Sequence, residues 1–140
     1  MMKIQINNGR IIDPANNIDR IGSVYIADGN IVSVSDEPVD FKPDNIINAE
    51  NQIVCPGFID LSTRLRDMGH SRKATFYSEV RAAASAGVTT LCLQPDTVPV
   101  IDTAAVVELV KELAEKAGYP QIYAIGALTQ KLEGTELSSM

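Results

Sequence analysis

Apolar and polar residues alternate in short runs over residues 1–54 of this chain. Alternation of this kind, bounded by turn-forming pairs, is typical of β-strands with one buried face. Asn8-Gly9 and Asp28-Gly29 favour tight hairpin turns, because these residue types tolerate the positive φ that such turns require. The pattern predicts a small β-sandwich domain over residues 1–54, with strands at residues 3–6, 23–27, 30–35, 46–47 and 52–54.

From residue 55 onward, strand signals alternate with helix signals. The predicted strands cover residues 58–65, 88–93 and 121–128, and the middle one is a continuous apolar run typical of a buried parallel strand. One predicted helix covers residues 75–86 and ends at Gly87; the other runs from Asp102 or Thr103 to Gly118. The apolar sides of the helices consist of Phe76, Val80, Ala83 and Ala84 in the first and of Val106, Val110, Leu113 and Ala117 in the second. This α/β order predicts a parallel sheet with right-handed crossovers.

The strand–helix units are too few to close a barrel, because a (β/α)8 barrel needs about 250 residues. Residues 135–140 resemble the start of another helix with nothing packed after it. We therefore expect the chain to be a fragment of a longer protein. An open parallel sheet also predicts self-association, aggregation or partial disorder near residue 140.

Composition excludes several classes of function. The 140 residues carry a net charge of −6 without a basic stripe, which argues against nucleic acid or anionic lipid as a partner. No apolar run approaches the ~20 residues of a membrane helix, so no membrane partner is expected. Cys55 and Cys92 lie in apolar stretches and form no CxxC pair, which favours buried, reduced thiols in a cytoplasmic protein.

The only histidine, His70, limits the metal chemistry of the chain. Transition-metal hydrolase sites are usually built from several imidazoles, so a self-contained histidine-rich centre is excluded. His70 follows a glycine in a predicted loop, where a solvated surface histidine is a better interpretation than a stray metal ligand.

Three segments carry a resemblance to a known family. Residues 54–61 read Val-Cys-Pro-Gly-Phe-Ile-Asp-Leu, residues 79–90 end in Ala-Gly-Val-Thr-Thr, and residues 94–102 read Gln-Pro-Asp-Thr-Val-Pro-Val-Ile-Asp. Together they resemble the dihydroorotases of the amidohydrolase superfamily. The resemblance implies that residues 55–140 are the first strands and helices of an incomplete TIM barrel, preceded by the small β-sandwich.

Dihydroorotases interconvert carbamoyl-aspartate and dihydroorotate in pyrimidine biosynthesis, and they use zinc that is often paired. The resemblance implies that the first barrel strand would read D-x-H-x-H-x-R, with two histidine ligands and an arginine that holds the substrate carboxylate. In this chain Ser62 and Arg64 stand at the two ligand positions. Arg66 matches the substrate arginine, and Asp96 replaces an asparagine that helps to bind the substrate.

These replacements imply that the family's metal site is disabled, and we expect no cofactor. Serine is a poor zinc ligand, and arginine has no free lone pair to offer. The fixed charge of Arg64 would also repel a dication by several kcal/mol at an effective dielectric of about 20. We expect Asp96 to pair with Arg64 or Arg66 instead, filling the vacated site with an ion pair.

Strand alternation predicts two faces for the first barrel strand. The face toward the barrel mouth carries Asp60, Ser62, Arg64 and Arg66, and the face toward the helices carries Ile59, Leu61 and Leu65.

Three functions from different classes remain open. The preferred one is a non-catalytic dihydroorotase-like protein that acts as a scaffold for aspartate carbamoyltransferase, a role that resemblance implies for homologues lacking the metal histidines. The second is an active dihydroorotase with altered metal ligands, whose further ligands would lie beyond Met140. The third is a metal-free carboxylate-binding module that keeps Arg66 to bind an anion. The resemblance separately implies that Arg66 and Asp96 are vestigial substrate-binding residues. We expect a homo-oligomer and no catalysis by this chain alone.

Overall fold

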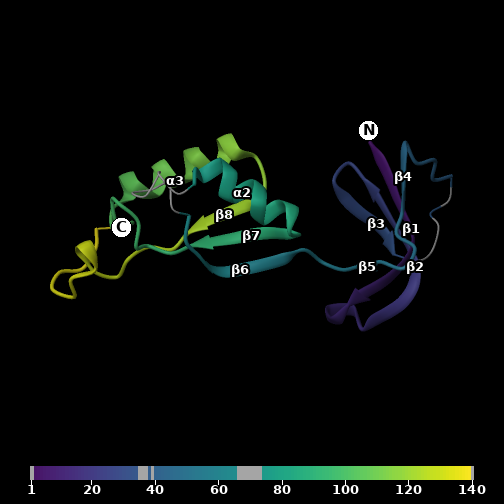
Figure 1. Ribbon diagram of the computed structural model, residues 1–140, viewed down its shortest axis with the longest axis horizontal. Coiled ribbons are helices and arrows are strands. Elements are labelled where there is room, and N and C mark those ends of the chain that lie inside the picture. Colours follow the sequence, from purple (N-terminus) through teal and green to yellow (C-terminus); the bar gives the residue numbers. More distant parts are fainter. Residues whose placement is uncertain (1, 35–37, 39, 66–73, 140) are drawn as a thin grey trace. The chain divides into compact units, whose positions relative to one another are not determined.

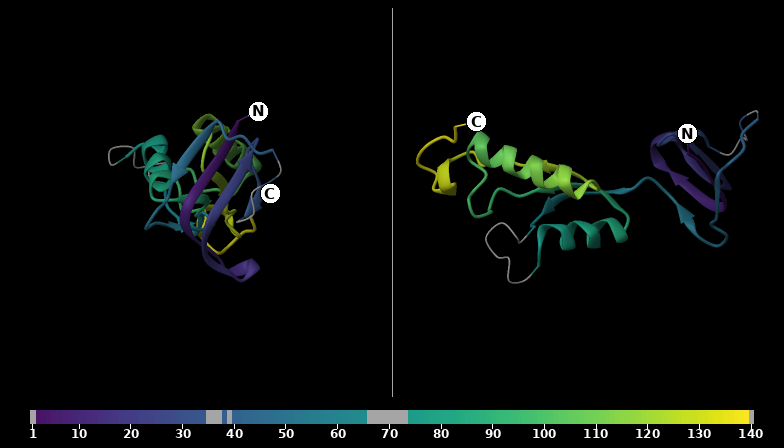
Figure 2. Two further views of the ribbon diagram at one scale, coloured as in Figure 1. Left: turned by 90° about the vertical axis from the view of Figure 1, so that its right-hand side faces the viewer. Right: turned by 90° about the horizontal axis from the view of Figure 1, so that it is seen from above.

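The computed structural model describes residues 2–34, 38, 40–65 and 74–139. The chain divides into two compact units, Met1–Pro56 and Gly57–Met140. The first consists of β-strands, and the second combines strands and helices, so the chain has mixed α/β structure (Figures 1 and 2). No helix within the described ranges is long and apolar enough to cross a membrane.

The first unit is one five-stranded sheet with the order β3-β2-β1-β4, in which β5 also pairs with β1 (Figure 1). β2 is antiparallel to β1 and β3, whereas β4 and β5 run parallel to successive halves of β1. The elements are β1 (Lys3–Asp13), the 3-10 turn η1 (Pro14–Asn16), β2 (Ile18–Ala27), β3 (Asn30–Val34), β4 (Asn45–Asn48) and β5 (Ile53–Val54).

Of the two predicted hairpin turns, one is present in the structure and the other is not. Asp28 and Gly29 have φ values of 51° and 78° and join paired strands, which confirms a tight turn there. The prediction for Asn8-Gly9 is wrong, because β1 continues through both residues. Asn8 does take a positive φ of 62°, but the register of β1 on β2 shifts between Ile6 and Gly9. The pair therefore forms a β-bulge, an alternative use of the same backbone conformation.

One face of this sheet is apolar. Directly paired residues share a face, and the pairs Ile4–Ile26, Ile6–Val24 and Val24–Val34 place aliphatic side chains together. An apolar pocket of about 240 Å³ opens on this side of the unit. On the other side the Tyr25 ring packs edge-on against Phe41 at 5.2 Å. Within the first unit, the described residues form a single sheet, so the second layer of the expected sandwich is not among them.

The second unit is a three-stranded parallel sheet with the order β6-β7-β8, covered on one face by two helices (Figure 1). The elements are β6 (Phe58–Thr63), α2 (Phe76–Ser85), β7 (Val88–Leu93), α3 (Ala104–Ala117), β8 (Gln121–Ala124) and the short 3-10 turn η2 (Gln130–Leu132). Its core consists of Leu65, Phe76, Val80, Leu91, Leu93, Ile101 and Val110, all nearly inaccessible to solvent. The predicted parallel sheet is confirmed, and the barrel is not closed.

Local sequence explains where the helices begin and end. Thr75 accepts a hydrogen bond from the Ser78 backbone N–H at 3.2 Å, and the Ser78 hydroxyl accepts one from the Thr75 N–H, so α2 starts with a capping box. Gly87 and Gly118 follow α2 and α3 with φ values of 84° and 79°, a conformation that glycine adopts without steric cost. These boundaries confirm the predicted helices.

The predicted packing of β6 is partly wrong. Leu65 is buried, but Ile59 and Leu61 are 62% and 70% exposed instead of packing under the helices. β6 is one of the two edge strands, and the helices pack on the other two strands, α2 on β7 and α3 on β8. The register of β6 on β7 also shifts between Asp60 and Thr63, so a strict two-residue alternation does not run through the strand.

The end of the chain also departs from prediction. β8 stops at Ala124, and residues 135–139 form no helix. They fold back instead, with an isolated antiparallel bridge between Thr129 and Leu137. Both cysteines are free, but Cys55 is exposed rather than buried.

Gly57 approaches β7 so closely that a side chain does not fit. A Cβ on Gly57 would overlap Cγ2 and Oγ1 of Thr89. We expect Gly57→Ala to lower the free energy of unfolding by about 1–3 kcal/mol, the usual cost of overpacking. Thr89→Ala in the same chain removes the two nearest atoms and should restore part of the loss. Urea unfolding of the parent, both single variants and the double variant measures this coupling, and strictly additive effects would contradict it.

Candidate functional site

The residues that the sequence singles out lie at the carboxyl end of β6. Asp60 and Ser62 belong to the strand, and Arg64 follows directly after it. All three are exposed. In α/β folds, residues at the carboxyl ends of parallel strands carry the chemistry, because the loops that follow converge there.

The Asp60 carboxylate is stabilised by its own strand. Oδ1 accepts a hydrogen bond from the Ser62 backbone N–H at 2.9 Å. This bond, helped by the nearby Thr63 hydroxyl, lowers the pKa of Asp60 below its ordinary value. The Thr63 Oγ1 is buried and makes no hydrogen bond of ordinary geometry, so we attribute the effect mainly to the amide of Ser62. Asp60 is therefore an anion at neutral pH.

Arg64 and Asp96 form an ion pair across two neighbouring strand ends. Arg64 Nε donates to Asp96 Oδ2 at 2.6 Å, and Asp96 lies in the loop after β7. The predicted pairing of Asp96 with one of the two arginines is present, and its partner is Arg64. The side chains are 66% and 40% exposed, so solvent screening limits the pair to about 0–1 kcal/mol. The pair orients the guanidinium more than it stabilises the fold.

The sequence did not predict the contacts that Gln94 makes with β6. Its backbone N–H donates to Thr63 O at 2.9 Å, and its side-chain amide reaches Leu61 O at 3.4 Å. Gln94 therefore bridges the irregular part of β6, next to the Arg64–Asp96 pair. The only sequence signal was its place directly after a buried parallel strand.

Two other candidates lie outside the described residues. Arg66, the residue that matches the family's substrate arginine, and His70 both fall within residues 66–73. The predicted role of Arg66, like that of Asp96 in binding substrate, stays a prediction.

The described carboxylates at this strand end are engaged with protein groups. Oδ1 of the Asp60 carboxylate accepts the Ser62 amide, and the Asp96 carboxylate is occupied by the Arg64 guanidinium. Within the described part of the chain, no three His, Cys, Asp or Glu side chains cluster in a way that could hold a metal ion. The interactions observed among the described residues here are charge pairing and hydrogen bonding.

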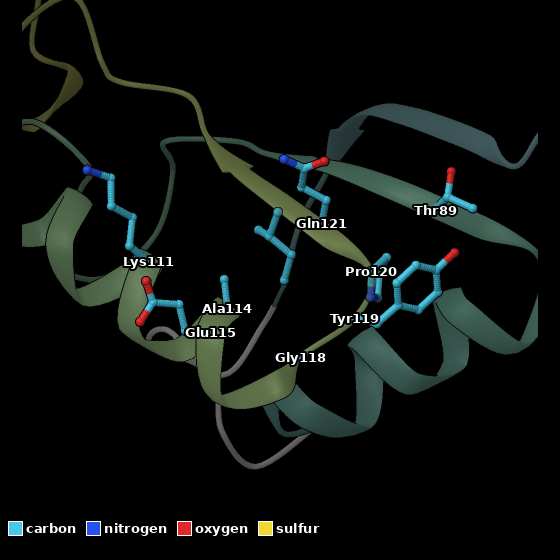
Figure 3. Close-up of a pocket in the computed structure, with 9 residues that line it drawn as sticks. Thr89, Lys111, Ala114, Glu115, Gly118, Tyr119, Pro120 and Gln121 are labelled. Carbon is cyan, nitrogen blue, oxygen red and sulfur yellow. The ribbon is translucent and has the colours of Figure 1, made fainter. Parts of the chain in front are cut away.

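A separate pocket of about 450 Å³ opens between the end of α3 and β8 (Figure 3). Tyr119 stands at one side of it, and Lys111 and Glu115 project from α3 at the other. Lys111 is already paired with Glu108 at 2.7 Å. The pocket also contains Gln121, the first residue of β8, so it lies at the amino end of that strand and is not part of the site at Arg64.

The lowered pKa of Asp60 predicts a pH dependence. A carboxylate with a lowered folded-state pKa contributes stability above its unfolded pKa of about 3.9, and that contribution disappears as pH falls through the folded pKa. We expect a carbon-13 NMR titration to place the pKa of Asp60 below the ordinary value. A pKa at or above that value would contradict the hydrogen bond from Ser62.

The Arg64–Asp96 pair predicts a small, salt-sensitive coupling. In a double-mutant cycle of Arg64→Gln and Asp96→Asn, we expect a coupling of about 0.2–1 kcal/mol that decreases at 1 M salt. The Lys116–Glu112 pair on α3, with an N–O distance of 3.9 Å, is a matched exposed control that should couple less. A zero coupling at low salt would show that the two side chains do not pair in solution.

Comparison with known proteins gives several relatives of similar sequence. The chain is 42% identical to a dihydroorotase-like protein of Pseudomonas aeruginosa over 139 residues, which is 99% of this chain and 33% of that protein. It is 40% identical to a dihydroorotase of Solibacter usitatus, again over 99% of this chain and 32% of the relative. The chain thus spans about a third of the length of these relatives.

The fold is shared with a solved hydantoinase structure. L-Hydantoinase from Arthrobacter aurescens superposes with a TM-score of 0.72 and 22% sequence identity, over 92% of this chain and 28% of the hydantoinase. At this identity the likeness concerns the fold alone, and it places the chain in the amino-terminal part of such a protein. Residues 51–140 also match the Dihydro-orotase-like family model. The chain therefore belongs to the Dihydro-orotase-like family.

Proposed function

We propose that this chain is part of a non-catalytic dihydroorotase-like protein of pyrimidine biosynthesis, which acts as a structural scaffold for aspartate carbamoyltransferase. One observation carries the proposal: Ser62 and Arg64 occupy the positions where the family resemblance expects two histidine ligands, and Arg64 is paired with Asp96. The relatives' names support the family, and the loss of catalysis rests on these residues.

The physical argument concerns charge and lone pairs. A guanidinium offers only donors and keeps its positive charge at every accessible pH. A dication close to the Arg64 guanidinium would be repelled. The Asp96 carboxylate, which could attract one, is already engaged by Arg64. Restoring a metal here would require breaking the ion pair and displacing the arginine side chain. A scaffold needs neither the metal nor the substrate, and it acts by burying surface against a partner subunit.

An active dihydroorotase is the second candidate. It is favoured by the relative from Solibacter usitatus, which is named dihydroorotase and is 40% identical to this chain. In that case Asp60 and ligands from outside the 140 residues would have to hold zinc despite Arg64. Retention of Arg66 keeps a third candidate open, a metal-free module that binds carboxylates.

Metal content separates the first two candidates. We expect the full-length parent protein to hold no stoichiometric zinc after incubation with the metal and to show no dihydroorotase turnover. The control is the variant Ser62→His with Arg64→His, which replaces both positions with imidazoles and should bind more zinc than the parent. Stoichiometric zinc together with turnover in the parent would refute the proposal.

Partner binding tests the scaffold role itself. We expect the parent protein to co-purify with the aspartate carbamoyltransferase of its own organism, and the Ser62→His, Arg64→His variant to do so equally well. Saturable binding of dihydroorotate without turnover, measured by calorimetry, together with no carbamoyltransferase complex, would favour the carboxylate-binding module instead.

A further inference from the structure

The loop at residues 94–103, which follows β7, is held in one conformation by its own contacts. The Thr97 hydroxyl donates to Pro99 O at 2.7 Å, and the Ile101 N–H donates to Pro95 O at 3.2 Å. Thr97 is 6% exposed, and the side chain of Ile101 is fully buried in the core of the second unit. These contacts fix the middle of the loop, and the loop carries two aspartates, Asp96 and Asp102, on either side of it.

Each aspartate contacts a different neighbour. Asp96 binds Arg64 at the end of β6, as described above. Asp102 Oδ2 accepts a hydrogen bond from the backbone N–H of Lys131 at 2.8 Å, in the segment that follows β8. The loop after β7 thus contacts the end of β6 through Asp96 and the segment that follows β8 through Asp102.

The segment that Asp102 contacts has an unusual backbone. Lys131 and Leu132 have φ values of 52° and 64°, a region that bulky residues rarely adopt. Such a conformation persists only where surrounding contacts determine it. The Asp102 carboxylate supplies one of these contacts, and it binds one of the two strained residues directly.

Other contacts fix the ends of the same segment. The Ala127 N–H donates to Ile101 O at 2.7 Å, and Ser138 Oγ donates to Ala127 O at 2.5 Å. Thr103 forms an isolated parallel bridge with Ser139. The segment at residues 127–139 is therefore anchored at both ends, and Asp102 provides a contact at its middle.

We propose that Asp102 is a positioning residue, whose carboxylate holds residues 127–139 against the loop at residues 94–103. Together with the Arg64–Asp96 pair, it lets this loop order the end of β6 and the segment after β8 without a metal ion. The statement about the metal rests on the proposed non-catalytic function, whereas the role of Asp102 toward Lys131 stands on its own contacts.

A simpler role for Asp102 would be electrostatic. It lies immediately before Thr103, the N-cap of α3, where a negative charge favours the positive end of the helix dipole. Thr103 makes no side-chain capping bond. The two roles differ in what they require: a helix-dipole role needs the charge, and the positioning role needs an oxygen acceptor at the Lys131 amide.

Amide hydrogen exchange of Lys131 distinguishes the two roles in the full 140-residue chain. We expect Asp102→Ala to speed exchange at Lys131 about tenfold, the effect of losing one hydrogen bond. Asp102→Asn keeps an oxygen acceptor and should exchange close to the parent rate. The amide of Leu91 in the core serves as reference and should not change in either variant. Equal acceleration in both variants, or no acceleration in Asp102→Ala, would overturn the proposal.

A second background covers the case in which Asp102→Ala fails to fold in the parent, because we expect the same variant to fold in the Lys131→Gly background. Lys131→Gly removes the steric cost of the positive φ, so the segment should depend less on Asp102. We expect Asp102→Ala to lower the urea midpoint less in the Lys131→Gly background than in the parent. An equal loss in both backgrounds would contradict the positioning role. The zinc measurement described above is independent of both tests, so failure of one proposal is distinguishable from failure of the other.

Discussion

The candidate site depends on one apolar core, in which α2 packs on β7 and α3 packs on β8. Leu91 and Leu93 are almost completely buried, and they meet Phe76 and Val80 of α2 and Val110 of α3 in one core. Burying side chains of this size contributes about 1.5–3 kcal/mol each, far more than the exposed ion pair at the strand end. This core fixes the direction in which β7 ends, and the loop that carries Asp96 starts from that point. The charged contacts add orientation to a position that apolar packing has already determined.

Features that depend on local sequence were predictable, and features that depend on neighbouring strands were not. The helices were predicted to within a residue or two, because capping residues and glycines act locally and the apolar spacing matches the helical repeat. The exposure of Ile59 and Leu61 was not predicted, because the pattern of a strand does not reveal whether another element covers it. Asn8-Gly9 was misread for a related reason. A positive φ is a local property of the residue pair. Whether that pair forms a turn or a bulge depends on whether the strand continues to pair with its neighbour after it.

For the site, the pairing of Asp96 with an arginine was predictable, because both positions follow adjacent parallel strands and have opposite charges. The contacts of Gln94 and Asp102 were not predictable, because both side chains bind backbone groups whose positions depend on the folded loops. A side chain that recognises the main chain leaves no complementary residue type in the sequence. The non-catalytic proposal, by contrast, rests on residue types alone at Ser62 and Arg64, which is why metal analysis can test it directly.

The bulge in β1 has a consequence for how this sheet tolerates changes in length. Before the bulge, β1 pairs with β4 in one register; after it, β1 pairs with β5 in another. Gly9 permits the change, because a Cβ there would come within 2.5 Å of Val54 Cγ2. Each half of β1 therefore has its own alignment, and inserting or deleting one residue in either half would turn that half's side chains to the opposite face. The open turn at Gly29, where added atoms meet nothing within 4 Å, is the place in this unit where extra residues would be accommodated.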